Sequence, residues 1–302
     1  MHLGTDTVHY VWDRDLAPAL DLDGSGTIEL DLLDSGSGQF DASSGHASLA
    51  SLDLGRVNPV TGPIRVRGAE PGDALLVRVL ELGTASWGWS ANIPGFGLLA
   101  EDFPRPVLVH SRIGETEVTL DFGPVLPVMP MIGTLGLAMS EAGPHPLLPP
   151  SRQGGNMDIR QLGAGASVLL PVAVSGALLS LGDAHAAMGD GEICGTGIET
   201  SARAVLEIEI VKNRPLTAPI LETPAAARRS GPALVTTGIG PDLLTAAKDA
   251  ARSLVDETVR RTGLSAVQAY ILASLTADLI VSEIVDLPNY VVSLHLPLDV
   301  LS

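Results

Sequence analysis

The sequence predicts a mainly β fold, sandwich-like or barrel-like, with a smaller C-terminal α+β part that contains two helices. Short alternating or apolar segments recur along the chain up to about residue 215, and glycine and proline turns separate them. Beyond that point the apolar residues change to helical spacing. We therefore expect a β-rich core over residues 1–215, which carries the candidate site, and a linker with an α+β region over residues 216–302.

The predicted strands share either alternation or a continuous apolar character. They are "TIELDLL" (27–33), "PIRVRGA" (63–69), "ALLVRVLEL" (74–82), "PVLVHSR" (106–112), "SVLLPVAV" (167–174) and "RAVLEIEIV" (203–211). Pro71, Gly72 and Asp73 separate the second segment from the third, and these residue types favour a tight turn. We therefore expect the segments on either side of this turn to pair as a hairpin.

The C-terminal region begins with a predicted helix. Its apolar residues recur with helical spacing from Pro241 and a glycine follows them as a stop signal: Leu244, Ala247, Ala251, Leu254, Val255, Val259 and then Gly263. Ser265 is placed to cap a second helix. One apolar face of that helix is predicted to contain Val267, Ile271, Leu275 and Leu279. "NYVVSLHLPL" (289–298) is predicted to close the chain as a strand.

Charge and composition exclude several classes of partner. The chain has 302 residues, with 35 acidic and 18 basic side chains and a net charge of −17. This charge opposes binding to nucleic acid and weakens attraction to anionic membranes. The N-terminus has no signal-peptide pattern and no apolar run is long enough to span a bilayer, so we expect a cytoplasmic protein. The single Cys194 excludes an intramolecular disulfide and is expected to be a small buried apolar residue.

Ionisable side chains gather in "LGDAHAAMGDGEICGTGIE" (181–199), directly after an apolar run. Asp183 and His185 are two residues apart, so on a strand both side chains point to the same face. Asp158, in "RQGGNMDI", could add a ligand from a neighbouring loop. Carboxylate oxygens and imidazole nitrogen suit a divalent cation, with zinc as the first expectation and calcium as the alternative. The competing interpretations are a turn-forming role for Asp183 and a packed core position for His185.

Nucleophilic mechanisms find little support in the sequence. Only two lysines occur, Lys212 and Lys248, and neither has the context of a lysine-assisted cysteine or serine nucleophile. No "GxSxG" nucleophile elbow occurs anywhere in the chain. A metal-activated water is therefore the better hypothesis. Of Glu192 and Glu199, one could act as a general base while the other is only hydrogen-bonded.

Four segments together resemble the acetamidase/formamidase family. They follow one another in order as "NPVTGPIRVRGAEPGD" (58–73), "PMIGTLGLA" (130–138), "GGNMD" (154–158) and "LGDAHAAMGDGEICGTGIE" (181–199). The resemblance, to the branch of about 300 residues, implies a mainly β fold with a small C-terminal α+β part. It also implies hydrolysis of short linear amides to a carboxylate and ammonia, a divalent metal, and a homo-oligomer, which we expect to be a dimer.

Roles for individual residues follow from this resemblance and the polar clusters. Asp158, Asp183 and His185 are the predicted metal ligands. Glu141 or Glu192 would take a proton from water and pass it to the leaving amine. In addition, Asn156 or the backbone amides of Gly155 and the preceding glycine would hold the developing oxyanion.

Two departures from the family pattern leave alternatives open. "DSGSGQ" keeps Asp34 and Gln39 of the family's "DCFGGQ" but changes the residues between them, and Gln153 stands where many members of the short branch have histidine. One alternative is therefore a non-catalytic β-sandwich that binds a metal or a ligand. Another is a lactam hydrolase that uses the same site.

Overall fold

The computed structural model describes residues 1–224 and 232–301. Its strands form three sheets, of which the largest has nine strands in the order β1-β4-β15-β6-β13-β16-β17-β19-β18. The bounds in this order are His2–Leu3, Gly26–Leu32, Ala202–Val211, Ala74–Thr84, Ser167–Pro171, Ile220–Thr223, Ala233–Gly240, Tyr290–Pro297 and Asp278–Glu283. Each of the six predicted strand segments overlaps a strand, so the mainly β prediction is confirmed.

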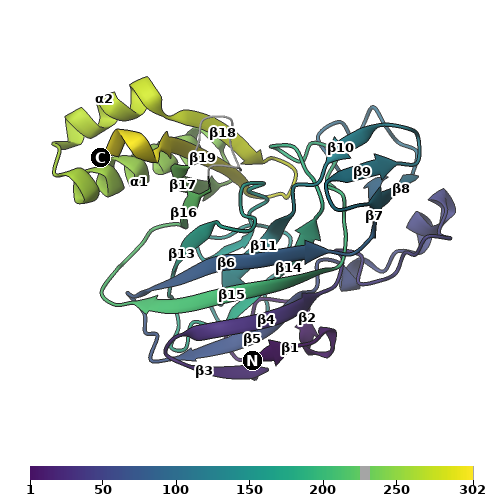
Figure 1. The fold of residues 1–302 in the computed structure, drawn as a ribbon, viewed down its shortest axis with the longest axis horizontal. Helices are drawn as coiled ribbons and strands as arrows, with labels where there is room; N and C mark the ends of the chain where they lie inside the picture. The colour runs from purple at the N-terminus through teal and green to yellow at the C-terminus, as the bar shows by residue number, and fades with distance from the viewer. Residues whose placement is uncertain (225–231, 302) are drawn as a thin grey trace.

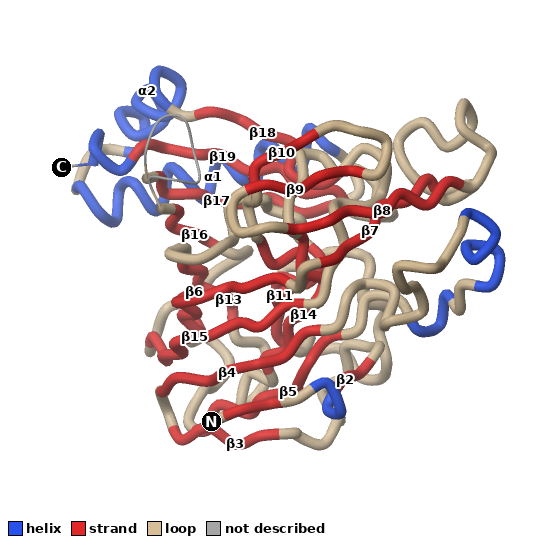
Figure 2. The backbone as a smooth tube through the Cα atoms, turned by 45° about the vertical axis from the view of Figure 1, so that its right-hand side comes forward, coloured by secondary structure: helices blue, strands red, loops and turns tan. Residues whose placement is uncertain are grey.

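A six-stranded sheet faces part of the largest one. Its order is β12-β11-β14-β5-β2, with β3 paired to β5, and the bounds are Gly154–Asn156, Met131–Leu137, Leu179–His185, Val60–Arg67, Val8–His9 and Leu20–Asp23. The smallest sheet has the order β10-β9-β8-β7, with bounds Val125–Pro127, Glu117–Leu120, Val107–Ile113 and Trp87–Asn92. Figures 1 and 2 show this small sheet above β4, β6 and β15 of the largest sheet and opposite the C-terminal helices.

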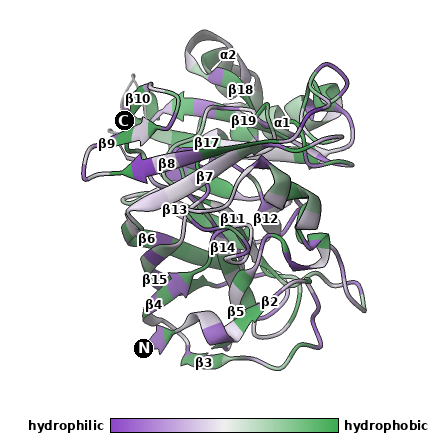
Figure 3. Cartoon of the chain, turned by 90° about the vertical axis from the view of Figure 1, so that its right-hand side faces the viewer, coloured by the Kyte–Doolittle hydropathy of each residue, from purple (hydrophilic) through white to green (hydrophobic). Residues whose placement is uncertain are grey.

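The main core lies between the two large sheets. Buried apolar side chains of one sheet, such as Ile28 and Val77, belong to the same cluster as Ile132, Leu179 and Leu181 of the other. Strands β4 and β15 alternate between hydrophobic and hydrophilic residues in Figure 3, as expected of strands with one buried face. By contrast, every residue of β11 and β14 is buried, so these strands are apolar along most of their length.

The predicted hairpin around Pro71-Gly72-Asp73 is wrong. Strand β5 pairs with β14, whereas β6 pairs with β13 and β15 in the other sheet. The turn therefore carries the chain from one layer of the sandwich to the other. Both flanking segments bury a face in the common core, and this alone produces their alternation, whether or not they pair with each other.

Helix α1 spans Leu243–Thr262 and begins and ends as predicted. The Asp242 carboxylate caps it by accepting the Thr245 backbone N–H at 2.7 Å, and Gly263 ends it with a φ of 74°. Of the apolar residues with helical spacing, Leu254 is buried and Leu244 is exposed, and the helix packs against β17 and β19.

Close packing on β17 favours small side chains in this helix. A Cβ on Gly238 would lie 1.8 Å from the Ala246 carbonyl oxygen, so the helix backbone rests directly on the sheet. Thr236 also donates its hydroxyl to the Ala250 carbonyl at 2.9 Å. The small side chains of Ala246 and Ala250 therefore let the helix backbone approach β17.

Helix α2 spans Ala266–Thr276, so the second predicted helix is present. The side chains of Val267, Ile271 and Leu275, which were expected to share its apolar face, lie outside the described part of the structure. Leu279 is not on this helix, because it belongs to β18, which pairs with β19, and its side chain is exposed. None of the helices in the described ranges combines the length and the apolar character that crossing a membrane requires.

Strands from both sides of residue 215 belong to the nine-stranded sheet, since β13 pairs with β16. The division into a β-rich core and a C-terminal region at that residue remains a prediction. Cys194, expected to be buried, is exposed on the loop after β14, where its thiol donates to the Ala91 carbonyl at 3.4 Å.

Candidate metal centre

Strand β14 positions the first two predicted site residues. All of its residues are buried. It lies between β11 and β5 in the six-stranded sheet. Asp183 and His185 lie at the end of this strand, with 3.4 Å between the carboxylate Oδ1 and the imidazole Nε2. The structure thus brings the two side chains together, as their spacing of two predicts.

Three more carboxylates surround the same imidazole. His185 Nε2 lies 3.1 Å from Glu199 Oε1 and 3.7 Å from Glu192 Oε1. On the other side of the ring, Nδ1 lies 3.9 Å from Asp158 Oδ1. Two triads could each hold a metal ion with atoms within 4.8 Å of one another, namely Asp158-His185-Glu192 and Asp183-His185-Glu199.

The unpaired oxygens of this cluster fit a cation. Both carboxylate oxygens of Asp158, which is fully buried, have no hydrogen-bond partner among the described residues, and the same holds for Glu199 Oε2. A buried carboxylate without a partner is costly, and metal coordination is one of the ways in which proteins satisfy it. One imidazole with several carboxylates is a donor set that suits zinc. The residues present therefore fit a divalent cation.

The backbone of β11 makes room for this cluster. A Cβ on Gly133 would lie 2.5 Å from Asp183 Oδ2 and 2.6 Å from Asp158 Oδ1. Only glycine lets both carboxylates lie so close to the strand. Gly133 belongs to "PMIGTLGLA" (130–138), so this segment contributes to the site through space and not through a functional side chain.

Charge crowding perturbs the pKa values of the cluster. Burial, followed by the negative charge of Asp183, holds the pKa of Asp158 well above its usual range. Burial and then Asp158 do the same to the pKa of Glu192. Burial opposes protonation of His185, but the carboxylates of Glu199 and Asp183 outweigh it and raise the imidazole pKa. Ionising these acids together is therefore costly, and a bound cation would offset that cost.

Three of the acids have left-handed backbone conformations. Asp158, Asp183 and Glu192 have φ angles of 45°, 56° and 43°. Residues other than glycine seldom adopt such angles, and those that do cluster at active sites and ligand clamps.

Asn156 lies next to the acids on β12. Its carbonyl oxygen accepts hydrogen bonds from the Thr134 hydroxyl and from Asn58 Nδ2, the latter at 3.2 Å. Asn58 Nδ2 also lies 3.4 Å from Asp183 Oδ2, so it links the amide to the acids. The Asn156 amide nitrogen donates to Asp286 Oδ2. These contacts fix which end of the Asn156 side chain is the donor.

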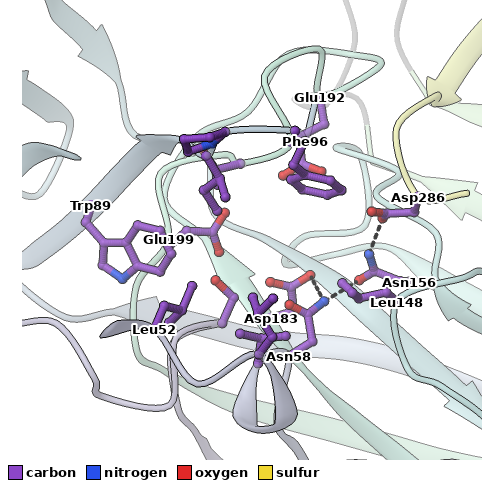
Figure 4. A pocket seen from close by; sticks show the side chains of 18 residues that line it. Leu52, Asn58, Trp89, Phe96, Leu148, Asn156, Asp183, Glu192, Glu199 and Asp286 are labelled. Atoms are coloured by element: carbon purple, nitrogen blue, oxygen red, sulfur yellow. Dashed lines mark hydrogen bonds between the residues drawn. The ribbon is translucent and has the colours of Figure 1, made fainter. Parts of the chain in front are cut away.

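A cavity of about 330 Å³ opens beside this cluster. Figure 4 shows Asp183, Glu199 and Asn58 in its middle, with Trp89 and Leu52 on one side and Asn156 and Asp286 on the other. The lining residues are Ser35, Leu52, Leu54, Val57, Asn58, Trp89, Ile93, Pro94, Gly95, Phe96, Leu148, Asn156, Asp183, Glu192, Gly195, Thr196, Glu199 and Asp286. A largely apolar wall with a few convergent polar groups is typical of small-molecule sites.

Two predicted site residues lie elsewhere. Glu141 is exposed on the loop after β11, where its carboxylate accepts the Ser140 hydroxyl at 3.0 Å, and it does not line the cavity. The sequence could not show on which side of β11 this loop leaves the sheet. Gly155 is buried on β12 with a φ of 93°, next to Asn156, but it also does not line the cavity.

Of the two segments that depart from the family pattern, "DSGSGQ" contacts a residue that lines the cavity. The Asp34 carboxylate, retained in "DSGSGQ", accepts the Gly36 and Gly38 backbone N–H groups and the Trp89 indole N–H at 3.1 Å. It therefore holds one wall of the cavity. Gln153 lies in the turn before β12 and does not line the cavity.

Sequence reasoning missed two contributors to the site. Asn58 opens the segment 58–73 quoted above and has a φ of 50°, so its motif could have pointed to it. Asp286 gives no such signal, because an aspartate two residues before Pro288 in "VDLPN" has the composition of an ordinary turn.

A sequence model of the Acetamidase/Formamidase family matches residues 2–145 and 142–302. The acetamidase of Mycolicibacterium smegmatis is 28% identical over 68% of this chain, and the formamidase of Methylophilus methylotrophus is 26% identical over 97% of it. The match spans 66% of the first of these relatives and 89% of the second, and 64% of a Schizosaccharomyces pombe relative.

Solved structures share the whole architecture. The acetamidase of Bacillus halodurans has a TM-score of 0.91 and 33% identity, covering 99% of this chain and 98% of its own. The acetamidase of Yersinia enterocolitica has a TM-score of 0.90 and 28% identity, covering 100% of this chain and 92% of its own. A gamma lactamase of Delftia acidovorans has a TM-score of 0.71 over 97% of this chain and 89% of its own, but at 24% identity it shares the fold alone.

Proposed function

The chain belongs to the acetamidase/formamidase family, and from this premise we propose that it hydrolyses short linear amides to a carboxylate and ammonia. The observation that carries the proposal is the buried cluster around His185 at a cavity large enough for such a substrate. Formamide and acetamide, which give the relatives their names, are the simplest substrates to test. The activity of the protein as a whole rests on this proposal.

We propose that Asp158, Asp183 and His185 hold a divalent metal, with zinc first and calcium second. The unpaired oxygens of Asp158 and the mixture of imidazole and carboxylate donors support zinc, because calcium prefers six to eight oxygen ligands. When bound, such an ion supplies Lewis acidity, which polarises a carbonyl and lowers the pKa of water to about 7. The two triads share His185, and Glu192 and Glu199 complete them at the same place.

Glu192 is our candidate for moving the proton. Its carboxylate lines the cavity, and burial followed by the charge of Asp158 raises its pKa, so it holds a proton more readily than an exposed glutamate does. It would take a proton from the attacking water and give it to the leaving nitrogen. Glu141, the alternative from the sequence, lies outside the cavity lining and is less suited to this role.

Asn156 is our candidate for stabilising the oxyanion. Its amide nitrogen has two N–H groups, of which one donates to Asp286. The other can contact the substrate oxygen, because Asn156 lines the cavity. The Thr134 and Asn58 bonds keep its carbonyl end away from the substrate, so the donor is oriented before the substrate binds.

Ammonia release from purified protein tests the proposal. The protein is stripped with a chelator and then assayed with formamide, acetamide and propionamide, with and without added zinc or calcium. We expect ammonia release only with metal. No release from any amide under either condition would contradict the proposal.

The same assay separates the alternatives. Binding of metal or amide without turnover would favour a non-catalytic binding protein. Faster turnover of a lactam than of its linear counterpart would favour a lactam hydrolase at the same site.

A further inference from the structure

We propose that Asp286 binds the substrate by accepting an N–H of the amide nitrogen, so that the site selects primary amides over esters and N,N-disubstituted amides. This inference rests on the proposed function and specifies its substrate class. It also gives the C-terminal region a direct part in recognition, since Asp286 lies in the connection between β18 and β19.

Hydrogen bonds of both its side chain and its backbone hold Asp286 at the cavity. Its side chain is 3% exposed and lines the cavity next to Asn156. Its backbone N–H donates to Glu283 Oε1 at 2.6 Å, which ties the connection to the end of β18. The carboxylate therefore has a defined position before any ligand arrives.

Four carboxylates line the cavity, and Asp286 differs from the others. Asp183, Glu192 and Glu199 all belong to the triads around His185. Asp286 belongs to neither triad. Burial and the charge of Glu283 raise the pKa of Asp286. Among the described residues its carboxyl group accepts one hydrogen bond, from the Asn156 amide nitrogen to Oδ2, which leaves Oδ1 as an acceptor for a ligand.

The chemistry of a primary amide requires such an acceptor. Two N–H donors leave water when the substrate enters a largely apolar cavity, and each buried donor without a partner costs about 1–3 kcal/mol. A carboxylate oxygen is a strong acceptor for an N–H group. Asn156 and Asp286 thus present a donor and an acceptor side by side, which complements the carbonyl oxygen and the nitrogen of the same amide.

The test compares substrates that differ at the nitrogen. Wild type, Asp286→Asn and Asp286→Ala are assayed for kcat/KM with acetamide and with methyl acetate, which has no N–H. In the asparagine variant the side-chain oxygen stays with the Asn156 donor, so an NH2 group faces the substrate nitrogen. We expect kcat/KM for acetamide to fall about 10-fold to 100-fold in both variants, while kcat/KM for methyl acetate changes less than about threefold.

Asp73→Asn is the matched control, because Asp73 is also a buried, hydrogen-bonded aspartate but lies at the turn between β5 and β6. It should leave the ratio of the two substrates unchanged. Equal losses on acetamide and methyl acetate, or no loss on acetamide, would overturn the assignment of Asp286.

Binding measurements distinguish failure of this inference from failure of the proposed function. Saturation-transfer NMR gives the affinities of acetamide and N,N-dimethylacetamide without turnover. If wild type prefers acetamide and Asp286→Asn abolishes that preference while neither releases ammonia, the inference stands and the proposed hydrolysis fails. If wild type releases ammonia but Asp286→Asn keeps the same preference, the hydrolysis stands and the inference fails.

Discussion

At the scale of single residues, His185 decides how the cluster of acids is held together. It is 1% exposed and lies near carboxylates at both of its ring nitrogens, Nε2 and Nδ1. If His185 is a metal ligand, it serves both triads. If it is a packed core histidine, it serves only to fill space. The two roles differ in what happens when the imidazole is removed.

The first prediction concerns His185→Ala. Removing the one imidazole of the cluster takes away a ligand from both triads, so we expect bound zinc to fall from about one ion per chain to near zero, with loss of ammonia release. Elemental analysis and the ammonia assay measure this on one preparation, and a melting curve shows that the fold survives.

His9→Ala is the control for this substitution. His9 is half-buried and bonds to the Val11 carbonyl and the Ser180 hydroxyl at 2.8 Å, away from the acids, so the variant should keep its metal. If His185→Ala melts at a lower temperature but retains full metal and activity, His185 is only a core residue.

At the scale of secondary structure, strand β11 contributes by having no side chain at Gly133. The second prediction is that Gly133→Ala drives the Asp158 and Asp183 carboxylates apart, because the new Cβ would lie within 2.6 Å of both. We expect a loss of about 1–3 kcal/mol in unfolding free energy and weaker zinc binding by at least tenfold. Urea titration and zinc titration measure the two effects.

Gly83→Ala on β6 is the matched strand control. A Cβ at Gly83 would meet nothing within 4 Å, so this variant should bind zinc as the wild type does. Zinc binding that survives in Gly133→Ala would mean that the two carboxylates are not held together by this strand.

Glu283, at the end of β18, gives the third prediction, which concerns pH. Burial raises its pKa to about 7 from an ordinary value of 4.5. Between these values the folded chain keeps the proton and the unfolded chain releases it, so the unfolding free energy of the metal-free protein falls as pH rises through this window. The difference amounts to about 3 kcal/mol.

Urea unfolding at pH values from about 4 to 8 checks this, with Glu283→Gln expected to lose about that much of the pH dependence. Glu115→Gln, at an exposed glutamate, should follow the wild type. Identical slopes for Glu283→Gln and wild type would show that this carboxyl titrates normally.

Individual strands could be predicted from the sequence, but their partners could not. Alternation along β4, β6 and β15 reports burial of one face, and this signal is local. Pairing depends on residues far apart, so the segments that flank the turn at 71–73 gave no sign that they lie in different sheets.

The residues of the candidate site also differ in whether the sequence alone could predict them. Asp183 and His185 could be placed together because a strand has a period of two. Asp158 and Glu192 reach the same point from segments outside the strands, and Asp286 arrives from the connection between β18 and β19, 94 residues after Glu192. That connection has no chemical pattern of its own. Contacts of this kind depend on tertiary packing, which one sequence does not reveal.

At the scale of the whole molecule, the nine-stranded sheet joins the two parts of the chain. Strands β13 and β16 pair through Ser167, Val168 and Leu169, and the cavity takes residues from both sides of residue 215. The fourth prediction is therefore a single calorimetric transition, which saturating zinc shifts upward as a unit. An ion at 100 times its Kd adds about 2.7 kcal/mol to the unfolding free energy.

Differential scanning calorimetry at several zinc concentrations checks this prediction. Two separate transitions, of which only one responds to zinc, would instead support independent domains divided near residue 215. The His185→Ala variant supplies the reference for a chain that does not respond to zinc.

The left-handed backbone at Asp158, Asp183 and Glu192 has a consequence for how this protein can change over evolutionary time. Each such residue costs about 1–3 kcal/mol, which glycine would recover at once. Glu192→Gly should accordingly melt at a higher temperature than the wild type in the absence of metal, yet gain less from zinc. Lineages under pressure for heat resistance and lineages under pressure for catalysis would thus be driven toward opposite residues at the same three positions.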